Sequence, residues 1–409
     1  NNMKTNVIIG AGAAGLMAAA ESAKRNINTI LIEKMPRCAS KVRITGKGRC
    51  NVTNACFDME DLISNVPRNP RFLYSAFSAF MPYDTMAFFE DLGVPLKIER
   101  GNRVFPQSDK AADIANALIK NAERAGVRFV HGNAKGFEFK NGKIGAVVLE
   151  SGEKIKCDSV CVCTGGNSYP ATGSTGQGYA LAKSAGHKII PVCAALVPLC
   201  CKNDFVSDLQ GLSLKNISIE LLKNGKKVYS DFGEMLFTHF GVSGPVVLSA
   251  SSHIDDVKNN SYSLVIDLKP ALDEATLDSR ILRDFGEFIN KDFINSLSKL
   301  LPKKLIPVIV KLSGIPADKK VNEITKQERL ALVSLIKKFK VDISSLYDID
   351  TAVVTRGGVD TKQIDPKTMR SKLVENLYFA GEVIDVDAYT GGFNLQIAFS
   401  TGFLCGNNM

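Results

Sequence analysis

The chain has 409 residues, more than one hydrophobic core usually organises, which predicts two or three domains. Its 45% hydrophobic and 23% charged residues are ordinary for a globular protein and exclude long disordered tracts. The net charge of +9 is spread in short pairs such as Lys226-Lys227, with no basic block interleaved with aromatic residues. We therefore predict no nucleic-acid partner and a preference for an anionic small molecule.

The ten cysteines are scattered and show no C-x-x-C spacing, so we expect neither a disulfide framework nor a metal site. No charged and then apolar leader precedes the first predicted strand, which favours a reducing, cytoplasmic location. The apolar runs at 6–20 and 377–386 are too short or too rich in glycine to cross a bilayer, so we predict no membrane association. No oligomeric state follows from the sequence.

The first 33 residues have the pattern of a βαβ unit. Residues 4–9 predict a buried strand, residues 13–24 predict an alanine-rich helix, and residues 29–32 predict a second strand. A Gly-x-Gly-x-x-Gly turn joins the first strand to the helix, and an acidic residue ends the second strand. This combination is typical of a dinucleotide-binding Rossmann unit.

Each residue type in this motif has a physical reason. Gly10 permits the tight turn, Gly12 lets the backbone approach a pyrophosphate, and Gly15 lets the helix pack closely on the strand. The helix N-terminus adds positive potential, and Glu33 can accept hydrogen bonds from ribose hydroxyls. A glycine-rich turn without a ligand is the alternative, which the complete unit disfavours.

The next segments alternate between helical and strand-like patterns. Residues 83–126 predict helices, and a short strand at 127–131 and a small antiparallel meander with Asn-Gly and Ser-Gly turns follow. The Rossmann sheet resumes with a strand at 159–163 that runs into Thr164-Gly165-Gly166, where glycine lets the backbone pass close to a cofactor.

The rest of the chain predicts an insertion followed by a return to the Rossmann pattern. Residues 189–266 are β-rich with a hairpin at Asn224-Gly225, and residues 274–339 are helical, with a capping box at Thr325 opening the last helix. A strand starting at Asn376 and a Gly-Gly turn before a helix restore the Rossmann pattern. The predicted domains are a discontinuous Rossmann domain of residues 1–188 and 351–409, a β-rich insertion of residues 189–270 with 341–350, and a helical insertion of residues 271–340.

Four separated blocks of the chain carry a likeness to a known family: VIIGAGAAGL at 7–16, TGKGRCNVTN at 45–54, LFTHFGVSGP at 236–245 and GEVIDVDAYTGGFN at 381–394. They resemble the bacterial BaiN-like flavoprotein family, whose members are named NAD(P)/FAD-dependent oxidoreductase, aminoacetone oxidase or 3-dehydro-bile acid Δ4,6-reductase. The likeness covers essentially the whole chain. It implies an α/β fold, with a Rossmann-type FAD-binding domain (GR2-like) interrupted by a β-barrel-like and a helical insertion.

The resemblance also implies cofactor roles for individual residues. Gly381 and Glu382 would contact the ribityl-phosphate region of FAD, and the turn at 391–394 would bring N–H groups to the pyrimidine edge of the flavin, where a helix N-terminus stabilises the reduced, anionic ring. Where the family often has Gly-Arg-Lys, this chain has Ala39-Ser40-Lys41, which keeps the lysine. The residues predicted to bind FAD are Gly10, Gly12, Ala13, Ala14, Gly15, Glu33, Lys34, Lys41, Gly48, Arg49, Asn51, Thr164, Gly165, Gly381, Glu382, Gly391, Gly392, Phe393 and Asn394.

Three residues are candidates for catalysis. Lys41 and Arg49 follow the second Rossmann strand, where their loop can fold back over the isoalloxazine ring, with a solvated loop as the alternative. His239 lies before a Gly-Val-Ser-Gly-Pro turn and can donate a proton to an activated double bond, although a lone histidine is more often structural. The glycine-rich segment at 173–178 is a candidate for a second phosphate-binding turn.

We therefore expect an FAD-dependent oxidoreductase that passes hydride between flavin N5 and a small organic substrate, with reduction of an activated C=C favoured. No second glycine fingerprint is present, so NAD(P)H would dock transiently as the donor. The alternatives are a flavin-dependent amine or aminoketone oxidase that produces hydrogen peroxide, and a non-catalytic flavin protein that senses redox state or assists RNA modification.

Overall fold

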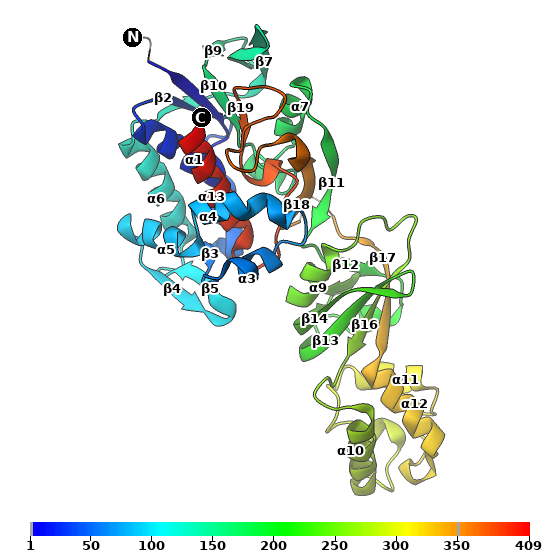
Figure 1. Cartoon of the computed structure of the whole chain (residues 1–409). Coiled ribbons are helices and arrows are strands. Elements are labelled where there is room, and N and C mark those ends of the chain that lie inside the picture. Colours follow the sequence, from blue (N-terminus) through cyan, green and yellow to red (C-terminus); the bar gives the residue numbers. More distant parts are fainter. Residues whose placement is uncertain (1–2, 349, 351) are drawn as a thin grey trace. The chain divides into compact units, whose positions relative to one another are not determined.

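The computed structural model describes residues 3–348, 350 and 352–409. The chain divides into two compact units, which consist of Asn1–Ala195 with Asp348–Met409, and of Leu196–Tyr347 (Figure 1). Each unit has its own hydrophobic core, so each is described by itself.

A five-stranded parallel sheet forms the centre of the first unit, with the strand order β19-β10-β1-β2-β6. Ile8 of β1 is paired with Leu31 of β2 on one side and with Cys161 of β10 on the other. These central strands are apolar and buried on both faces, as expected for a parallel sheet covered by helices. The strand bounds are β1 (Thr5–Ile9), β2 (Asn28–Glu33), β6 (Arg128–His131), β10 (Ser159–Val162) and β19 (Leu377–Phe379).

The helix of the first βαβ unit packs against the last helix of the chain. In Figure 1 the red α13 (Phe393–Asn408) lies beside the blue α1 (Ala13–Lys24). A Cβ atom on Gly402 would lie 2.5 Å from the carbonyl oxygen of Ala14, and one on Gly406 would lie 2.4 Å from that of Ala18. Glycine at these two positions therefore allows the two helix backbones to approach each other closely.

The chain between β2 and β6 adds helices and a small sheet. The order β3-β5-β4 forms three antiparallel strands, and Gly101 and Asn102 turn the chain between β4 and β5 with positive φ angles. The predicted run of helices over 83–126 is therefore wrong at residues 96–106, because this turn supports strand pairing instead. The bounds are α2 (Ser40–Ile44), β3 (Thr53–Asn54), α3 (Met59–Ser64), α4 (Tyr74–Ala79), α5 (Pro82–Asp91), β4 (Leu96–Glu99), β5 (Arg103–Pro106) and α6 (Ala111–Arg124).

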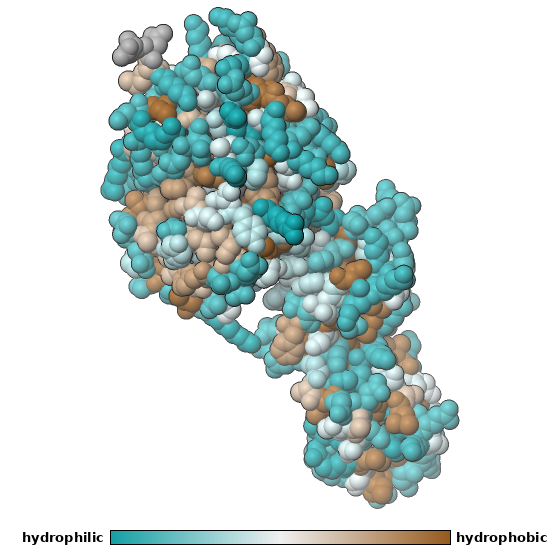
Figure 2. All heavy atoms as spheres, viewed as in Figure 1, coloured by the Kyte–Doolittle hydropathy of each residue, from teal (hydrophilic) through white to brown (hydrophobic). Residues whose placement is uncertain are grey.

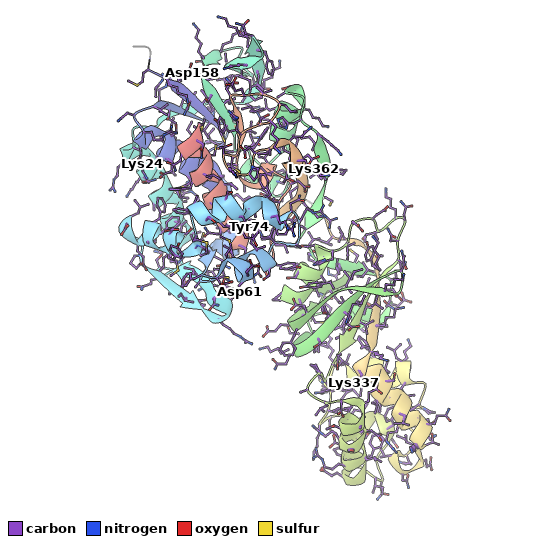
Figure 3. All side chains as sticks on the ribbon, in the orientation of Figure 1. Lys24, Asp61, Tyr74, Asp158, Lys337 and Lys362 are labelled. Carbon is purple, nitrogen blue, oxygen red and sulfur yellow. The ribbon has the colours of Figure 1, made fainter. Side chains whose placement is uncertain are left out.

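Two further small sheets complete the first unit. The predicted meander is confirmed as the antiparallel order β7-β8-β9, and β11 pairs antiparallel with β18. Asp158, labelled in Figure 3, accepts a hydrogen bond of 2.7 Å from the N–H of Thr5 at the start of β1. The bounds are β7 (Ala134–Lys140), β8 (Lys143–Leu149), β9 (Lys154–Lys156), α7 (Gln177–Ser184), β11 (Ile189–Ala195) and β18 (Val354–Val359).

The second unit contains a closed barrel with the strand order β12-β15-β14-β13-β16-β17. Its longest hairpin joins β13 to β14 at Asn224-Gly225, both with positive φ, which confirms the predicted turn. The bounds are β12 (Leu199–Cys201), α8 (Phe205–Asp208), β13 (Ser213–Lys223), β14 (Lys226–Phe237), β15 (Gly241–Ser243), α9 (Pro245–Ser251), β16 (Tyr262–Asp267) and β17 (Phe339–Leu346).

The helices between β16 and β17 belong to the same compact unit as the barrel. They are α10 (Glu274–Glu287), α11 (Ile306–Ser313) and α12 (Lys326–Lys337), and α12 opens with the predicted capping box of Thr325 and Glu328. Lys337, labelled in Figure 3, forms an ion pair of 2.8 Å with Asp267 of β16. Helices and barrel therefore share one core. The N-terminal segment of the first unit extends through β11 and ends at Ala195.

Hydrophilic side chains cover much of the visible surface, with hydrophobic residues between them (Figure 2). Exposed apolar side chains on the helices of the second unit include Leu282, Leu312 and Leu330. Among the described residues, no helix is long and apolar enough to cross a membrane.

Candidate functional site

The glycine-rich turn holds the N-terminus of α1 at the carboxyl end of β1. Gly10 has a φ of +104°, and a Cβ atom on it would lie 2.4 Å from the carbonyl oxygen of Cys163. A Cβ atom on Gly15 would lie 1.7 Å from the carbonyl oxygen of Gly10. Gly12, by contrast, has open space where its Cβ would be, in front of the first turn of α1. The first backbone N–H groups of α1, including those of Ala13 and Ala14, have no acceptor within the helix and can bind an anion there.

Glu33 lies at the end of β2, beside this turn. Its Oε2 accepts a hydrogen bond of 2.8 Å from the N–H of Ala11, and its Oε1 accepts one of 2.8 Å from the N–H of Met35. Each carboxylate oxygen has capacity for a further hydrogen bond, so Glu33 is held in position and can still accept from ribose hydroxyls.

The carboxyl end of β10 brings a second glycine-rich segment near the first. The hydroxyl oxygen of Thr164 is buried without a hydrogen-bond partner among the described residues, and a Cβ on Gly178 would lie 1.9 Å from it. Lys34 donates a hydrogen bond of 2.7 Å to the hydroxyl of Thr175, and partial burial lowers the pKa of this lysine. The loop at 173–178 therefore lies against the segment that follows β2.

Lys41 and Glu382 form the central ion pair of the site. The Nζ of Lys41 lies 2.7 Å from Oε2 of Glu382 and 2.7 Å from the hydroxyl of Ser168. The other oxygen of Glu382 accepts a hydrogen bond of 2.7 Å from the N–H of Thr355. Both charged side chains are mostly buried, with exposures of 23% and 20%. Three chain segments therefore fix the Glu382 carboxylate.

Lys41→Met is expected to lower the free energy of unfolding by about 1–3 kcal/mol, because it leaves a mostly buried carboxylate without its cation. The double variant Lys41→Met with Glu382→Gln should recover part of this loss, since the charge that needs the cation is gone. Urea unfolding of the two single variants and the double variant measures the coupling. Strict additivity of the two single effects would contradict the direct pairing.

The N-terminus of α13 is connected to β3 and to the loop that precedes the helix. Gly391 and Gly392 have positive φ angles, and a Cβ atom on Gly392 would lie 2.3 Å from the carbonyl oxygen of Thr53. Asn54 donates a hydrogen bond of 3.0 Å to the carbonyl of Gly391. Asn394 bonds to both the N–H and the carbonyl of Ala388, at 2.9 and 2.8 Å. The turn and the preceding loop are therefore connected by direct hydrogen bonds.

Arg49 contacts acidic residues of the small β3-β5-β4 sheet. Its guanidinium bonds to Asp109 at 2.6 Å and to Glu99 at 2.5 Å, and it lies 4.2 Å from the ring centroid of Phe105. The hydrogen bonds to Glu99 and Asp109 raise the pKa of Arg49. In turn, hydrogen bonds from Arg49 and Lys97 lower the pKa values of the Glu99 and Asp109 carboxyl groups. Its positive charge is thus largely neutralised by protein groups.

Gly48 has a φ of +84°, and Asn51 follows two residues after Arg49 in the chain. The side-chain oxygen of Asn51 is buried and has no hydrogen-bond donor among the described residues. His239 belongs to the second unit, in the exposed connection between β14 and β15, with its ring 5.1 Å from that of Phe240.

Several polar residues of the site were missed in the sequence. Ser168 and Thr355 contact predicted residues but lie far from them in the chain, so no local pattern marks them, whereas Asn54 ends the block at 45–54. Asp385 and Asp387 lie inside the block at 381–394, and the Asp-x-Asp spacing before the Gly-Gly turn was a signal that went unused.

The arrangement fits a dinucleotide cofactor. An open helix N-terminus, an acidic residue at the end of the neighbouring strand β2 and the buried, unpartnered hydroxyl of Thr164 after β10 lie at the carboxyl edge of the parallel sheet. That edge is where open α/β sheets bind nucleotides. The described residues contain no group of three or more His, Cys, Asp or Glu side chains arranged to hold a metal ion.

Comparison with known proteins gives relatives over nearly the full length. A Clostridium scindens protein named 3-dehydro-bile acid delta(4,6)-reductase is 31% identical over 420 residues, covering 98% of this chain and 97% of that protein. Proteins named ribosomal RNA dihydrouridine synthase from Escherichia coli and Haemophilus influenzae are 29% and 32% identical over 405 residues, with the same coverage.

The fold itself is similar to that of a solved dehydrogenase structure. The 3-ketosteroid delta1-dehydrogenase of Sterolibacterium denitrificans, in complex with 1,4-androstadiene-3,17-dione, matches with a TM-score of 0.51 and 11% identity, covering 100% of this chain and 99% of that one. At this identity the likeness concerns the fold alone. The model described as HI0933-like protein Rossmann domain matches residues 4–408. The chain therefore belongs to the HI0933-like family, with a Rossmann-type FAD-binding domain and a barrel insertion.

Proposed function

We propose that this protein uses FAD to reduce a carbon–carbon double bond conjugated to a carbonyl group, with NAD(P)H as the electron donor. The observation that carries the proposal is the convergence of the α1 N-terminus, Glu33 and Glu382 at the carboxyl ends of β1, β2 and β19 in one parallel sheet. Such an edge supplies N–H groups for phosphates and fixed acceptors for ribose and ribityl hydroxyls.

The names of the relatives support this reaction class. A 3-dehydro-bile acid reduced at positions 4 and 6 is a steroid ketone with conjugated double bonds. Dihydrouridine differs from uridine by reduction of the ring double bond that is conjugated to a carbonyl. Both reactions add hydride to the carbon remote from the carbonyl and a proton to the adjacent carbon, so a shared hydride source and a positioned acid serve both.

When bound, FAD would supply the hydride at its N5 atom. The first turn of α1 would bind the pyrophosphate, Glu33 the adenosine ribose, and Glu382 the ribityl region, with Lys41 holding the Glu382 carboxylate in place. The α13 N-terminus would face the pyrimidine edge. Arg49 would hold the loop at 45–51 in place through its ion pairs with Glu99 and Asp109. We propose His239 as the proton donor.

The test is anaerobic mixing of the FAD-loaded protein with NADH or NADPH, followed by absorbance of the oxidised flavin. Rapid bleaching by one nucleotide, and recovery of the colour on addition of a conjugated enone, is the expected result. A protein that holds no flavin, or a flavin that neither nucleotide bleaches, would contradict the proposal. Bleaching by an amine, with hydrogen peroxide formed in air, would favour the oxidase alternative, and no turnover with any donor would favour a non-catalytic redox sensor.

A second candidate substrate is a uridine in ribosomal RNA. Two relatives are named for that reaction, and, although the basic pairs are spread along the whole chain, residues 269–340 have an excess of 15 Lys and Arg over nine Asp and Glu. Positive charge of this kind favours a polyanion. Faster recovery of flavin colour with an unmodified rRNA fragment than with a steroid enone would select this candidate. A matched fragment that already contains dihydrouridine is the control.

A further inference from the structure

A buried pair of aspartates follows Glu382 in the loop that leads to α13. Asp385 and Asp387 are 4% and 1% exposed. Asn69 donates to both the carbonyl oxygen and Oδ2 of Asp385, at 2.7 and 3.2 Å. Both side-chain oxygens of Asp387 are buried without a hydrogen-bond donor among the described residues. The two neighbouring carboxyl groups therefore have different surroundings, and Asp387 is the less stabilised as an anion.

The charged groups around Asp387 come from three segments. Arg68, from the loop before α4, has its Nε 3.6 Å from Oδ1 of Asp387. Arg356 of β18 also favours the anion, whereas Asp385 and Glu382 from the same loop disfavour it. Burial is the largest effect and outweighs the two arginines, which raises the pKa of Asp387 to about 6. This side chain can therefore change its protonation state near neutral pH.

Asp387 is linked to the first turn of α13 through the residue that follows it. The next residue, Ala388, exchanges two hydrogen bonds with the side chain of Asn394. Asn54 holds the carbonyl of Gly391 from the other side. These hydrogen bonds connect the backbone next to Asp387 to the first turn of α13, so the buried Asp387 side chain leaves the chain one residue before a segment bonded to the helix N-terminus.

We propose that Asp387 is a proton-holding positioning residue, which takes up a proton from water when negative charge is placed at the N-terminus of α13. This inference rests on the proposed function, in which the flavin edge that gains negative charge on reduction lies at that helix end. Two electrons from a reductant such as dithionite enter with one proton on the cofactor, and a second proton goes to a carboxylate oxygen of Asp387. On reoxidation, both protons return to solvent or substrate.

The physical reason is electrostatic. A new negative charge near a carboxylate in a medium of low dielectric constant disfavours its ionised form, so the proton affinity of Asp387 rises. The proton bound by Asp387 cancels the negative charge added at the α13 N-terminus, so the net charge of the two together is unchanged. Arg68 and Arg356 then need not move to compensate, and the loop at 385–388 keeps α13 in position in both redox states.

The experiment is a redox titration of the FAD-loaded protein with dithionite and mediator dyes between pH 5 and pH 9. Each proton taken up with two electrons contributes ~30 mV per pH unit to the slope of the potential. In the wild-type protein, the potential should change with pH as expected for about two protons per two electrons in a window that begins near pH 6. Outside this window, the slope should correspond to about one proton per two electrons. Asp387→Asn should show the one-proton slope throughout.

Two further variants make the result decisive. Arg68→Gln should shift the start of the steep window to higher pH, because it removes a cation that favours the ionised Asp387. Asp91→Asn, at an exposed position of α5, should leave the wild-type profile unchanged. A one-proton slope over the whole range in the wild-type protein would overturn the inference even if Asp387→Asn failed to fold. Failure of the wild-type protein to retain FAD would instead contradict the proposed function.

Discussion

Gly15→Ala is expected to lower the stability of the ligand-free protein by about 3 kcal/mol or more, equivalent to roughly 5–10 °C in Tm. The added Cβ would lie 1.7 Å from the carbonyl oxygen of Gly10, a backbone atom that cannot rotate away. The start of α1 would have to move away from the turn at the end of β1, and the contact of Gly10 with β2 through its N–H to the carbonyl of Ile32 would be disturbed.

Gly12→Ala is the matched control, because it adds the same methyl group three residues earlier in open space. The φ of −87° at Gly12 is allowed for alanine, so the Tm of the ligand-free protein should be unchanged. The methyl group would lie where a pyrophosphate approaches the first turn of α1. We expect a loss of about ten- to hundredfold in FAD affinity from weakened charged hydrogen bonds.

Thermal unfolding of the two ligand-free variants and FAD binding followed by flavin fluorescence separate these effects. Equal Tm losses in both variants would show that the clash at Gly15 is relieved by small movements. Unchanged FAD affinity in Gly12→Ala would mean that the pyrophosphate does not lie at this turn.

Asp387→Asn is expected to make the ligand-free protein more stable at pH 7, relative to wild type, by up to ~3 kcal/mol. The folded-state pKa of about 6 lies some two units above that of an aspartate in an unfolded chain. Between pH 4 and pH 6 the native state therefore binds more protons than the unfolded state, and wild-type stability falls as pH rises. Above about pH 6 the whole cost of the buried charge is present. Asparagine carries no such charge.

Urea unfolding of both proteins at pH 4.5, 6 and 7.5 measures this difference. The two stabilities should be similar at pH 4.5, where Asp387 is protonated, and should diverge as pH rises. Asp91→Asn, at an exposed site, controls for the change in net charge. A difference that does not depend on pH would show that Asp387 is ionised throughout and is better paired than its contacts indicate.

The part of the site that the sequence predicts is the part encoded by local spacing. The first 33 residues contain the whole βαβ unit, including Gly10, Gly12, Gly15 and the acidic end of β2. The hairpin between β13 and β14 is marked by only two residues, Asn224 and Gly225. The backbone conformation at these turns allows only certain residue types, so the pattern can be recognised in the sequence without knowledge of the fold.

The remaining contacts could not be predicted, because they join distant segments. Lys41 and Glu382 are 341 positions apart, and Asn69 and Asp385 are 316 apart. Arg49 was predicted at the flavin, but nothing near it in the chain indicates that Glu99 and Asp109 bind it. The strands β4 and β5 were missed for a related reason. Short strands gain their stability from pairing, which a helical spacing of apolar residues nearby can obscure.

The packing of α13 on α1 also bears on how the protein is made. The glycine face of α13 is synthesised long after α1, because residues 25–392 separate the two helices. At a synthesis rate of about 5–20 residues per second, roughly 20–70 s pass between the synthesis of α1 and that of α13. Residues 196–347 are contiguous and have their own core, so that unit can form during the wait. Until α13 is made, the alanine-rich surface of α1 that it covers stays exposed in the nascent chain and is open to non-native apolar contacts.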